Sequence, residues 1–289
     1  MNDKGVLLEL ALADAYGVGF EFRPTAFVQA NNRLERYFPH ERYVELHGKY
    51  SDDTQLSLAL AELMLSGADW TIQNIAYQFV KVFQRDVRPG YSSRMYNALS
   101  ESRDGADFIN RIDNRSEGSG AAMRSAVLGL LKTEEELLEK AAIQAKVTHD
   151  TTSAVLSSQA VALGAHYFAY ELGPKNEVAT YISSSINGHW DQEWKGPAKS
   201  KGTDCVLAAL TAIQRNDNQT DLLRNCVAFT GDVDTVAAIA LGMTAFSTEV
   251  AANLPQWMYD ELENGIYGRD YLQAIDQQLH HKFTIRNKP

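Results

Sequence analysis

The sequence contains little cysteine and no long uncharged apolar run. Only two of its 289 residues are cysteines, Cys205 and Cys226, and both lie in apolar stretches typical of helices. Their spacing indicates neither a disulfide framework nor a zinc site, so we expect buried, reduced thiols. No run of about 18 uncharged apolar residues occurs, which excludes a membrane-spanning helix. The N-terminal apolar stretch contains Glu9 and Asp14 and lacks a basic leader, so we expect no signal peptide and a cytoplasmic location.

Basic charge is also scarce. The chain has 27 Lys and Arg against 37 Asp and Glu, a net charge of −10. Such a protein repels nucleic acids and anionic membranes and attracts cations, so we expect no nucleic-acid or membrane partner. A phosphorylated substrate would then need local backbone donors or a bound metal.

Proline is rare as well, and its placement predicts an all-α, single-domain protein over residues 1–289. All seven prolines lie between or at the ends of segments with helical periodicity, because proline breaks helix interiors. No linker or internal repeat divides the chain. Irregular stretches are expected at residues 23–50 and 187–202. Helices are predicted at residues 54–65, from Thr71, from Thr133, and at residues 150–170, 206–213, 222–229 and 236–246.

The first chemical motif is YSDDTQ, which places Ser51, Asp52 and Asp53 directly before a helix. Two carboxylates and a hydroxyl form a hard-oxygen cluster suited to Mg²⁺ or Mn²⁺. Ser and Asp are also common helix N-caps, and capping alone would explain this motif taken by itself.

The second motif is GDVDT, in which Asp232, Asp234 and Thr235 begin a helix that is apolar almost all round. Such a helix belongs in the core, so its first turn would carry charges inward. Buried carboxylates need compensation, which a divalent cation provides. Together the two motifs could hold a pair of divalent ions, with capping as the alternative.

A third motif, GSGAAMR, is expected to open an Ala- and Leu-rich helix. Small residues with free N–H groups at a helix N-terminus form an anion site. No strand precedes the motif, which argues against a dinucleotide-binding fold. A close helix–helix contact is the alternative. The anion-site candidates are Gly118, Ser119, Gly120 and Ala121.

Three further features are ambiguous by themselves. Glu21 follows Asp14 after a glycine-containing stretch and could lie in a loop over a pocket. His149 is either a structural residue or a ligand-binding one. The loop with Trp190 and Trp194 either gates a site or packs down.

Five ordered blocks of the sequence resemble the ADP-ribosylglycohydrolase family, which includes dinitrogenase reductase-activating glycohydrolase and the human ADP-ribosylhydrolases. The blocks are LADAYGVGFEF, YSDDTQLSLAL, SGAAMRSAVLGLL, VTHDTTSA and GDVDTVAAIALG. The resemblance implies an all-α orthogonal helical bundle with a two-metal centre at helix N-termini. It also implies two Mg²⁺ or Mn²⁺ ions as cofactors.

The resemblance also assigns roles to individual residues. Glu21 resembles a flexible-loop glutamate near the metals, and His149 matches a Thr-His motif of the substrate site. The implied catalytic residues are Glu21, Asp52, Asp53 and Asp234. The implied metal ligands are Ser51, Asp52, Asp53, Asp232, Asp234 and Thr235. The implied diphosphate loop is Gly118, Ser119, Gly120 and Ala121.

One departure concerns the scissile bond. Arginine-specific members carry an Asp in a DVGN-like segment, whereas this chain reads RDVRPGYSS with Asp86 out of register. The resemblance therefore implies hydrolysis of the bond between ADP-ribose and a protein side chain or small molecule, and it leaves the acceptor open. The alternatives are a non-catalytic ADP-ribose-binding or toxin-neutralising protein, and a hydrolase of another N- or O-glycoside.

Overall fold

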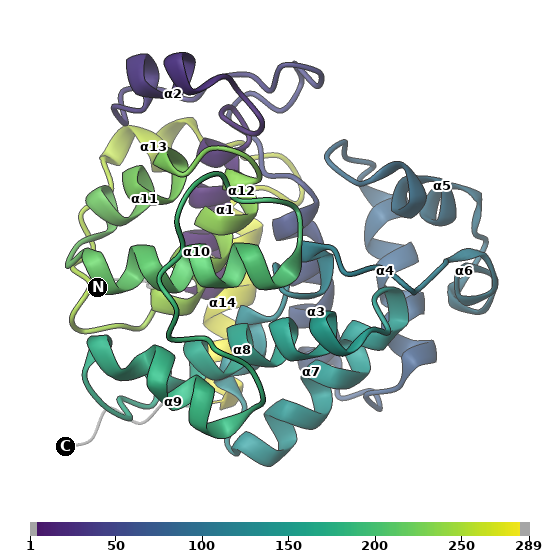
Figure 1. Ribbon diagram of the computed structural model, residues 1–289. Coiled ribbons are helices and arrows are strands. Elements are labelled where there is room, and N and C mark those ends of the chain that lie inside the picture. Colours follow the sequence, from purple (N-terminus) through teal and green to yellow (C-terminus); the bar gives the residue numbers. More distant parts are fainter. Residues whose placement is uncertain (1–4, 284–289) are drawn as a thin grey trace.

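The computed structural model describes residues 5–283, and this part of the chain is all-α (Figure 1). The described residues form no sheet, and only isolated β-bridges join loops. The elements are α1 (Val6–Gly17), α2 (Thr25–Asn31), α3 (Asp52–Ser66), α4 (Ile72–Arg85), α5 (Ser93–Glu101), α6 (Gly105–Arg111), η1 (Ser119–Ala121), η2 (Ala126–Leu130), α7 (Glu134–Thr148), α8 (Thr152–Ala169), η3 (Lys175–Glu177), α9 (Val178–Ser185), α10 (Gly202–Arg215), α11 (Gln219–Ala228), α12 (Val233–Thr244), α13 (Gln256–Glu261) and α14 (Arg269–Phe283).

The local signals for helix ends are confirmed. Thr71 and Thr133 each accept a hydrogen bond from a backbone N–H in the first turn of α4 and α7, respectively. Gly67 ends α3 in the left-handed conformation, with φ of 73°. Pro24 and Pro255 directly precede α2 and α13, which agrees with the exclusion of proline from helix interiors. Pro289 lies outside the described residues.

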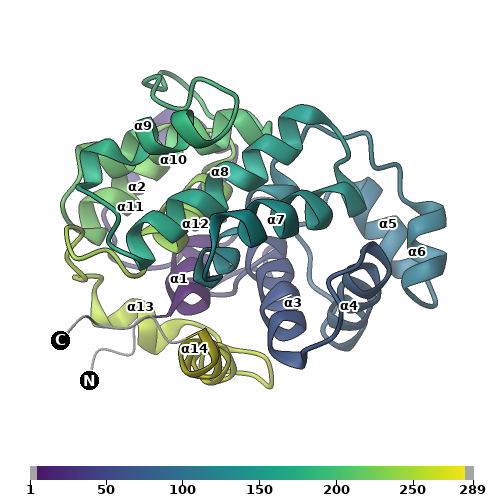
Figure 2. The same ribbon diagram turned by 90° about the horizontal axis from the view of Figure 1, so that it is seen from below.

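Helices α1 and α12 form the centre of the fold. Every residue of both helices is buried, and the two pack side by side (Figures 1 and 2). Helices α8, α10 and α11 also pack on α12, while α3 and α14 pack on α1. The sequence prediction that the helix after GDVDT is a core helix is therefore confirmed. Its N-terminal carboxylates are carried into the protein interior.

A buried aspartate ties α1 to the start of α3. Oδ2 of Asp14 accepts hydrogen bonds from the Ser51 N–H at 2.9 Å, the Thr54 N–H at 3.1 Å and the Thr54 hydroxyl at 2.6 Å. Asp14 has no solvent exposure, and burial raises its pKa to about 6. This contact fixes where the first acidic motif begins.

Two expectations about local structure are wrong. The GSGAAMR segment does not open an α-helix: η1 and η2 are short 3₁₀ helices, held by i→i+3 bonds such as Leu128 N–H to the Ser125 carbonyl. Tertiary contact decides this, because the Ser119 N–H bonds the Ser200 carbonyl of a distant loop and η2 packs against α8. The stretch 23–50, expected to be irregular, contains the short helix α2.

Within residues 5–283, no helix combines the length and the apolar character needed to cross a bilayer. Helices α4, α5 and α6 pack together and form the right-hand part of the molecule in Figure 1. The candidate site lies where this part meets the N-termini of α3 and α12.

Candidate functional site

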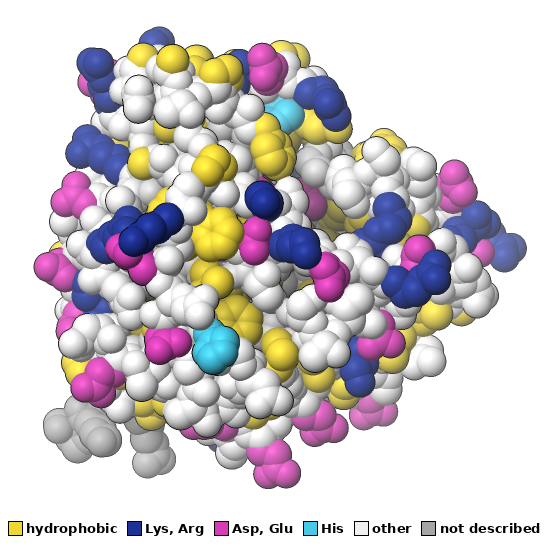
Figure 3. Space-filling view, viewed as in Figure 1, with side chains coloured by type: hydrophobic (Ala, Val, Ile, Leu, Met, Phe, Trp, Pro, Cys, Tyr) yellow, Lys and Arg dark blue, Asp and Glu magenta, His cyan; other side chains and the backbone are white. Residues whose placement is uncertain are grey.

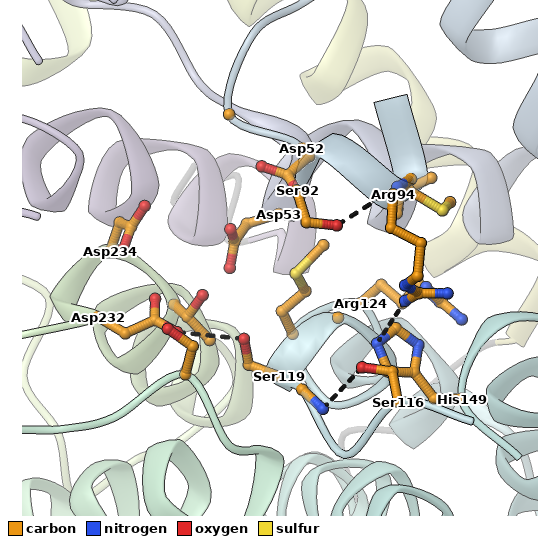
Figure 4. A pocket seen from close by; sticks show the side chains of 18 of the residues that line it. Asp52, Asp53, Ser92, Arg94, Ser116, Ser119, Arg124, His149, Asp232 and Asp234 are labelled. Carbon is orange, nitrogen blue, oxygen red and sulfur yellow. Dashed lines mark hydrogen bonds between the residues drawn. The ribbon is translucent and has the colours of Figure 1, made fainter. Parts of the chain in front are cut away.

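A cavity of about 320 Å³ brings the separated sequence motifs together (Figure 4). The N-terminus of α3 contributes Asp52 and Asp53, and the N-terminus of α12 contributes Asp232, Asp234 and Thr235. The turn after α1, the η1 segment and the end of α7 contribute the remaining predicted residues. These are Glu21, Gly118, Ser119, Gly120 and His149. Two predicted site residues, Ser51 and Ala121, are fully buried behind the lining.

One end of the cavity is acidic. Carboxylate oxygens of Glu21, Asp232 and Asp234 all lie within 4.8 Å of one another, a separation suited to one metal ion. Asp52 and Asp53 line the same end from α3 (Figure 4). The structure therefore places Glu21 in one carboxylate cluster with the second acidic motif.

Two of these buried carboxylates each have an oxygen atom without a hydrogen-bond partner among the described residues. Asp53 and Asp234 are 3% and 5% exposed, and the Oδ1 atom of each has no hydrogen-bond partner among the described residues. Burial, together with the neighbouring negative charges, raises the pKa of both carboxyl groups well above the ordinary range. Such unpaired carboxylates are destabilising unless a cation or a proton compensates them. This donor set of hard oxygens fits Mg²⁺ or Mn²⁺.

Helix capping explains only part of the two acidic motifs. The Ser51 hydroxyl accepts the Asp53 N–H at 3.4 Å, so Ser51 caps α3. The Asp232 side chain caps nothing, although the residue occupies the N-cap position of α12. Instead it accepts hydrogen bonds from the Ser119 hydroxyl at 3.2 Å and the Cys205 thiol at 3.7 Å. Asp232 therefore links the acidic motif to the glycine-rich segment.

The turn that carries Glu21 is fixed to the turn that precedes α12. The Phe22 N–H bonds the Gly231 carbonyl at 2.8 Å, and Phe22 adopts a left-handed backbone with φ of 49°. Gly231 has φ of 90°, and a Cβ there would lie 1.9 Å from the Ala198 carbonyl oxygen, so only glycine fits. Strained backbone beside a cluster of charges is typical of functional sites.

His40 holds the Glu21 carboxylate, a contact that sequence analysis missed. The His40 Nε2 atom lies 3.1 Å from Glu21 Oε2. His40 Nδ1 accepts the backbone N–H groups of Arg42 at 3.0 Å and Tyr43 at 2.9 Å. Because Nδ1 accepts two hydrogen bonds, we assign the ring proton to Nε2, which donates to Glu21. His40 lies in the stretch expected to be irregular, where no pattern marked it.

The opposite end of the cavity is basic and contains His149, Arg94 and Arg124 (Figure 4). His149 Nδ1 lies 2.7 Å from the Thr148 hydroxyl, and His149 Nε2 lies 3.5 Å from Arg94 Nη2. Burial and the two nearby guanidinium groups lower the pKa of His149 well below the ordinary range, so its ring is neutral. Neither Arg94 nor Arg124 was predicted, although Arg124 ends the GSGAAMR motif.

Arg124 is completely buried yet has one free donor. Its Nε and Nη2 groups donate to Gln144 and Thr148, and its Nη1 atom has no partner among the described residues. Burial lowers the pKa of Arg124 to about 9. The nearby Gly118, Ser119 and Gly120 line the same part of the cavity. This end can accept an anionic group.

The two tryptophans do not line the cavity. Trp190 is 4% exposed and packs into the core. The backbone N–H of Trp194 donates to the Thr211 hydroxyl at 2.8 Å. Their loop reaches the cavity only through Ser200.

Comparisons with known proteins identify relatives along nearly the whole chain. A family model described as ADP-ribosylglycohydrolase matches residues 4–288. The ADP-ribosylarginine hydrolase Tri1 of Pseudomonas putida (strain GB-1) is 24% identical over 96% of this chain and 77% of its own length. The ADP-ribosyl-[dinitrogen reductase] glycohydrolase of Rhodospirillum rubrum is 24% identical over 95% of this chain and 94% of its own length. A solved structure titled "ADP-ribosylglycohydrolase-related protein complex" superposes with a TM-score of 0.73 at 21% identity, covering 96% of both chains, which shows a shared fold.

Proposed function

Because the chain belongs to the ADP-ribosylglycohydrolase family, we propose that it hydrolyses the glycosidic bond between ADP-ribose and a modified protein side chain. The observation that carries this proposal is the polarity of the cavity: five carboxylates line one end, and two arginines and a histidine line the other. ADP-ribose has a matching polarity, with neutral ribose hydroxyls at the end to be cleaved and a diphosphate beyond them. The named relatives act on ADP-ribosylarginine or on ADP-ribosyl-dinitrogen reductase, which supports a protein side chain as acceptor.

The acidic end would hold two Mg²⁺ or Mn²⁺ ions. The ligands that we propose are Asp232 and Asp234 first, with Asp52, Asp53 and Thr235 completing the set. Ser51 would act on the metal only through Asp53, because its hydroxyl donates to the Asp53 carboxylate at 3.4 Å. Bound ions would supply positive charge that orients the ribose hydroxyls and polarises the attacking water. The unpartnered Oδ1 atoms of Asp53 and Asp234 support this assignment.

We propose Glu21 as the general base that accepts the proton of the attacking water. It lines the cavity, and burial raises the pKa of its carboxyl group. A carboxylate in such a position can act as a general base as the bond to the anomeric carbon opens through an oxocarbenium-like state. His40 orients Glu21 by holding Oε2, which leaves Oε1 for the reaction.

The basic end would bind the diphosphate and the adenosine. The backbone N–H group of Gly120 and the free Nη1 of Arg124 offer donors to phosphate oxygens, whereas the Gly118 N–H already donates to the Ser116 hydroxyl at 3.1 Å. His149, being neutral, would contribute a flat ring for stacking or a hydrogen bond. The free, buried thiols of Cys205 and Cys226 support a reducing compartment, and we propose the cytoplasm.

The test is release of free ADP-ribose from Arg-linked and Ser-linked ADP-ribosylated peptides with Mg²⁺, with Mn²⁺ and with a chelator. We expect metal-dependent release from one peptide, which identifies the bond. The double variant Asp232→Ala/Asp234→Ala should fold and lose turnover. Full activity of that variant in chelator would refute the metal role. Tight ADP-ribose binding without release from either peptide would favour a non-catalytic binding protein or another glycoside substrate.

A further inference from the structure

A second hollow adjoins the first. It has a volume of about 370 Å³ and lies between the loop at residues 43–45 and the segment at residues 87–97. Figure 3 shows the surface recessed between the upper loops and the part of the molecule that carries α5. The lining combines apolar and polar side chains, including Tyr43, Glu45, Val87, Tyr96 and Asn97. We call this hollow the side groove.

The side groove meets the acidic end of the cavity at a single glycine. Gly90 lines both hollows. It has φ of 109°, and a Cβ there would lie 2.6 Å from Asp52 Oδ1 and 3.0 Å from Ser51 Cβ. A side chain at this position would therefore push on the start of α3 and obstruct the junction. Glycine at position 90 therefore leaves the junction between the groove and the carboxylate cluster free of a side chain.

The charge distribution gives the cavity a direction. Arg124 and His149, the residues proposed to bind the diphosphate and the adenosine, lie at the far end, away from Asp52. A substrate whose diphosphate lies at the basic end presents its anomeric carbon to the acidic end, beside Gly90. The group on the other side of the scissile bond must then leave the cavity near Gly90, where the side groove begins.

The rim of the side groove exposes apolar side chains. Val44, Val87 and Tyr96 are 67%, 57% and 39% exposed. Neighbouring exposed apolar side chains beside a site are typical of a surface that binds a partner. A polypeptide fits this surface because its apolar side chains and its backbone polar groups match a groove lined by both apolar and polar residues.

We propose that the side groove binds the polypeptide segment of the ADP-ribosylated protein next to its modified residue. This inference rests on the proposed hydrolase function and specifies how that substrate is recognised. The groove would distinguish a modified protein from a single ADP-ribosylated amino acid, because only the former reaches beyond Gly90.

The experiment compares two substrates with the same linkage, an ADP-ribosylated peptide and the free ADP-ribosylated amino acid, each in Arg-linked and Ser-linked form. Val87→Trp fills the groove, and Tyr96→Ala removes part of its wall. Tyr77→Ala is the matched control, since Tyr77 is 55% exposed and lines neither hollow. Affinity for ADP-ribose and the melting temperature are measured for every variant to establish folding.

We expect both groove variants to raise KM for the peptide about tenfold, which corresponds to about 1.4 kcal/mol, with KM for the amino acid and affinity for ADP-ribose unchanged. Tyr77→Ala should behave as the unaltered protein. Unchanged peptide KM in both groove variants, or equal losses on both substrates, would overturn the groove assignment alone. No hydrolysis of any substrate by the unaltered protein would overturn the proposed function, and the groove assignment with it.

Discussion

Replacing Asp234 by Asn should stabilise the metal-free protein while removing its response to metal. Asp234 lies within 4.8 Å of carboxylate oxygens of both Glu21 and Asp232. At that separation two full negative charges repel by about 3.5 kcal/mol at an effective dielectric constant of about 20. Partial protonation reduces this repulsion, because burial raises the pKa of Asp234. Its Oδ1 atom has no hydrogen-bond partner among the described residues to lose, so we expect a net stabilisation of about 1–3 kcal/mol.

The assay is urea unfolding in chelator and in Mn²⁺. A ligand present at about 100 times its Kd adds about 2.7 kcal/mol to the stability of a protein that binds it only when folded. We expect that gain in the unaltered protein and a much smaller one in Asp234→Asn. Asp191→Asn, an exposed loop position, is the control for the same change of charge. Destabilisation of the metal-free Asp234→Asn protein would refute the electrostatic reasoning, and an undiminished gain in Mn²⁺ would refute the ligand assignment.

Three further predictions follow from the contacts around the cavity. His40→Ala should lower kcat about tenfold with little change in KM, because Glu21 loses its orienting donor. The control His47→Ala, in the same loop, should leave both constants unchanged. Steady-state kinetics of the two variants tests this prediction. Arg94→Ala should weaken ADP-ribose binding about tenfold by removing a cation from the basic end, and calorimetry showing unchanged affinity would place the diphosphate elsewhere. Burial raises the pKa of Asp276 to about 7, so the folded protein holds this proton more tightly than the unfolded chain does. The free energy of unfolding therefore falls as pH rises from about 4 to 7. Asp276→Asn should flatten that part of the pH profile measured by urea unfolding, and an unaltered slope would contradict this prediction.

Much of the fold could be predicted from the sequence because helix signals are local. The caps at Thr71 and Thr133 act within one turn of the residue itself, and Gly67 needs only its own backbone freedom. The burial of the helix after GDVDT followed from its almost entirely apolar composition. The α-helix predicted to begin in the segment at residues 118–131 is absent, although the composition of this segment favours a helix. Its hydrogen bond to Ser200 and its packing on α8 impose 3₁₀ geometry instead.

The candidate site divides in the same way. The sequence by itself predicted that the carboxylates of the acidic motifs are carried into the protein interior. Acidic residues at the start of a buried helix must enter the interior with that helix. The family resemblance predicted Glu21 near the metals, but the tertiary structure shows how it joins Asp232 and Asp234, because the Phe22 and Gly231 backbones meet across more than 200 residues of chain. It also brought His40 to Glu21, and Arg94 to His149. Each of these pairs depends on long-range packing of whole helices and loops, for which a single sequence carries no local signal.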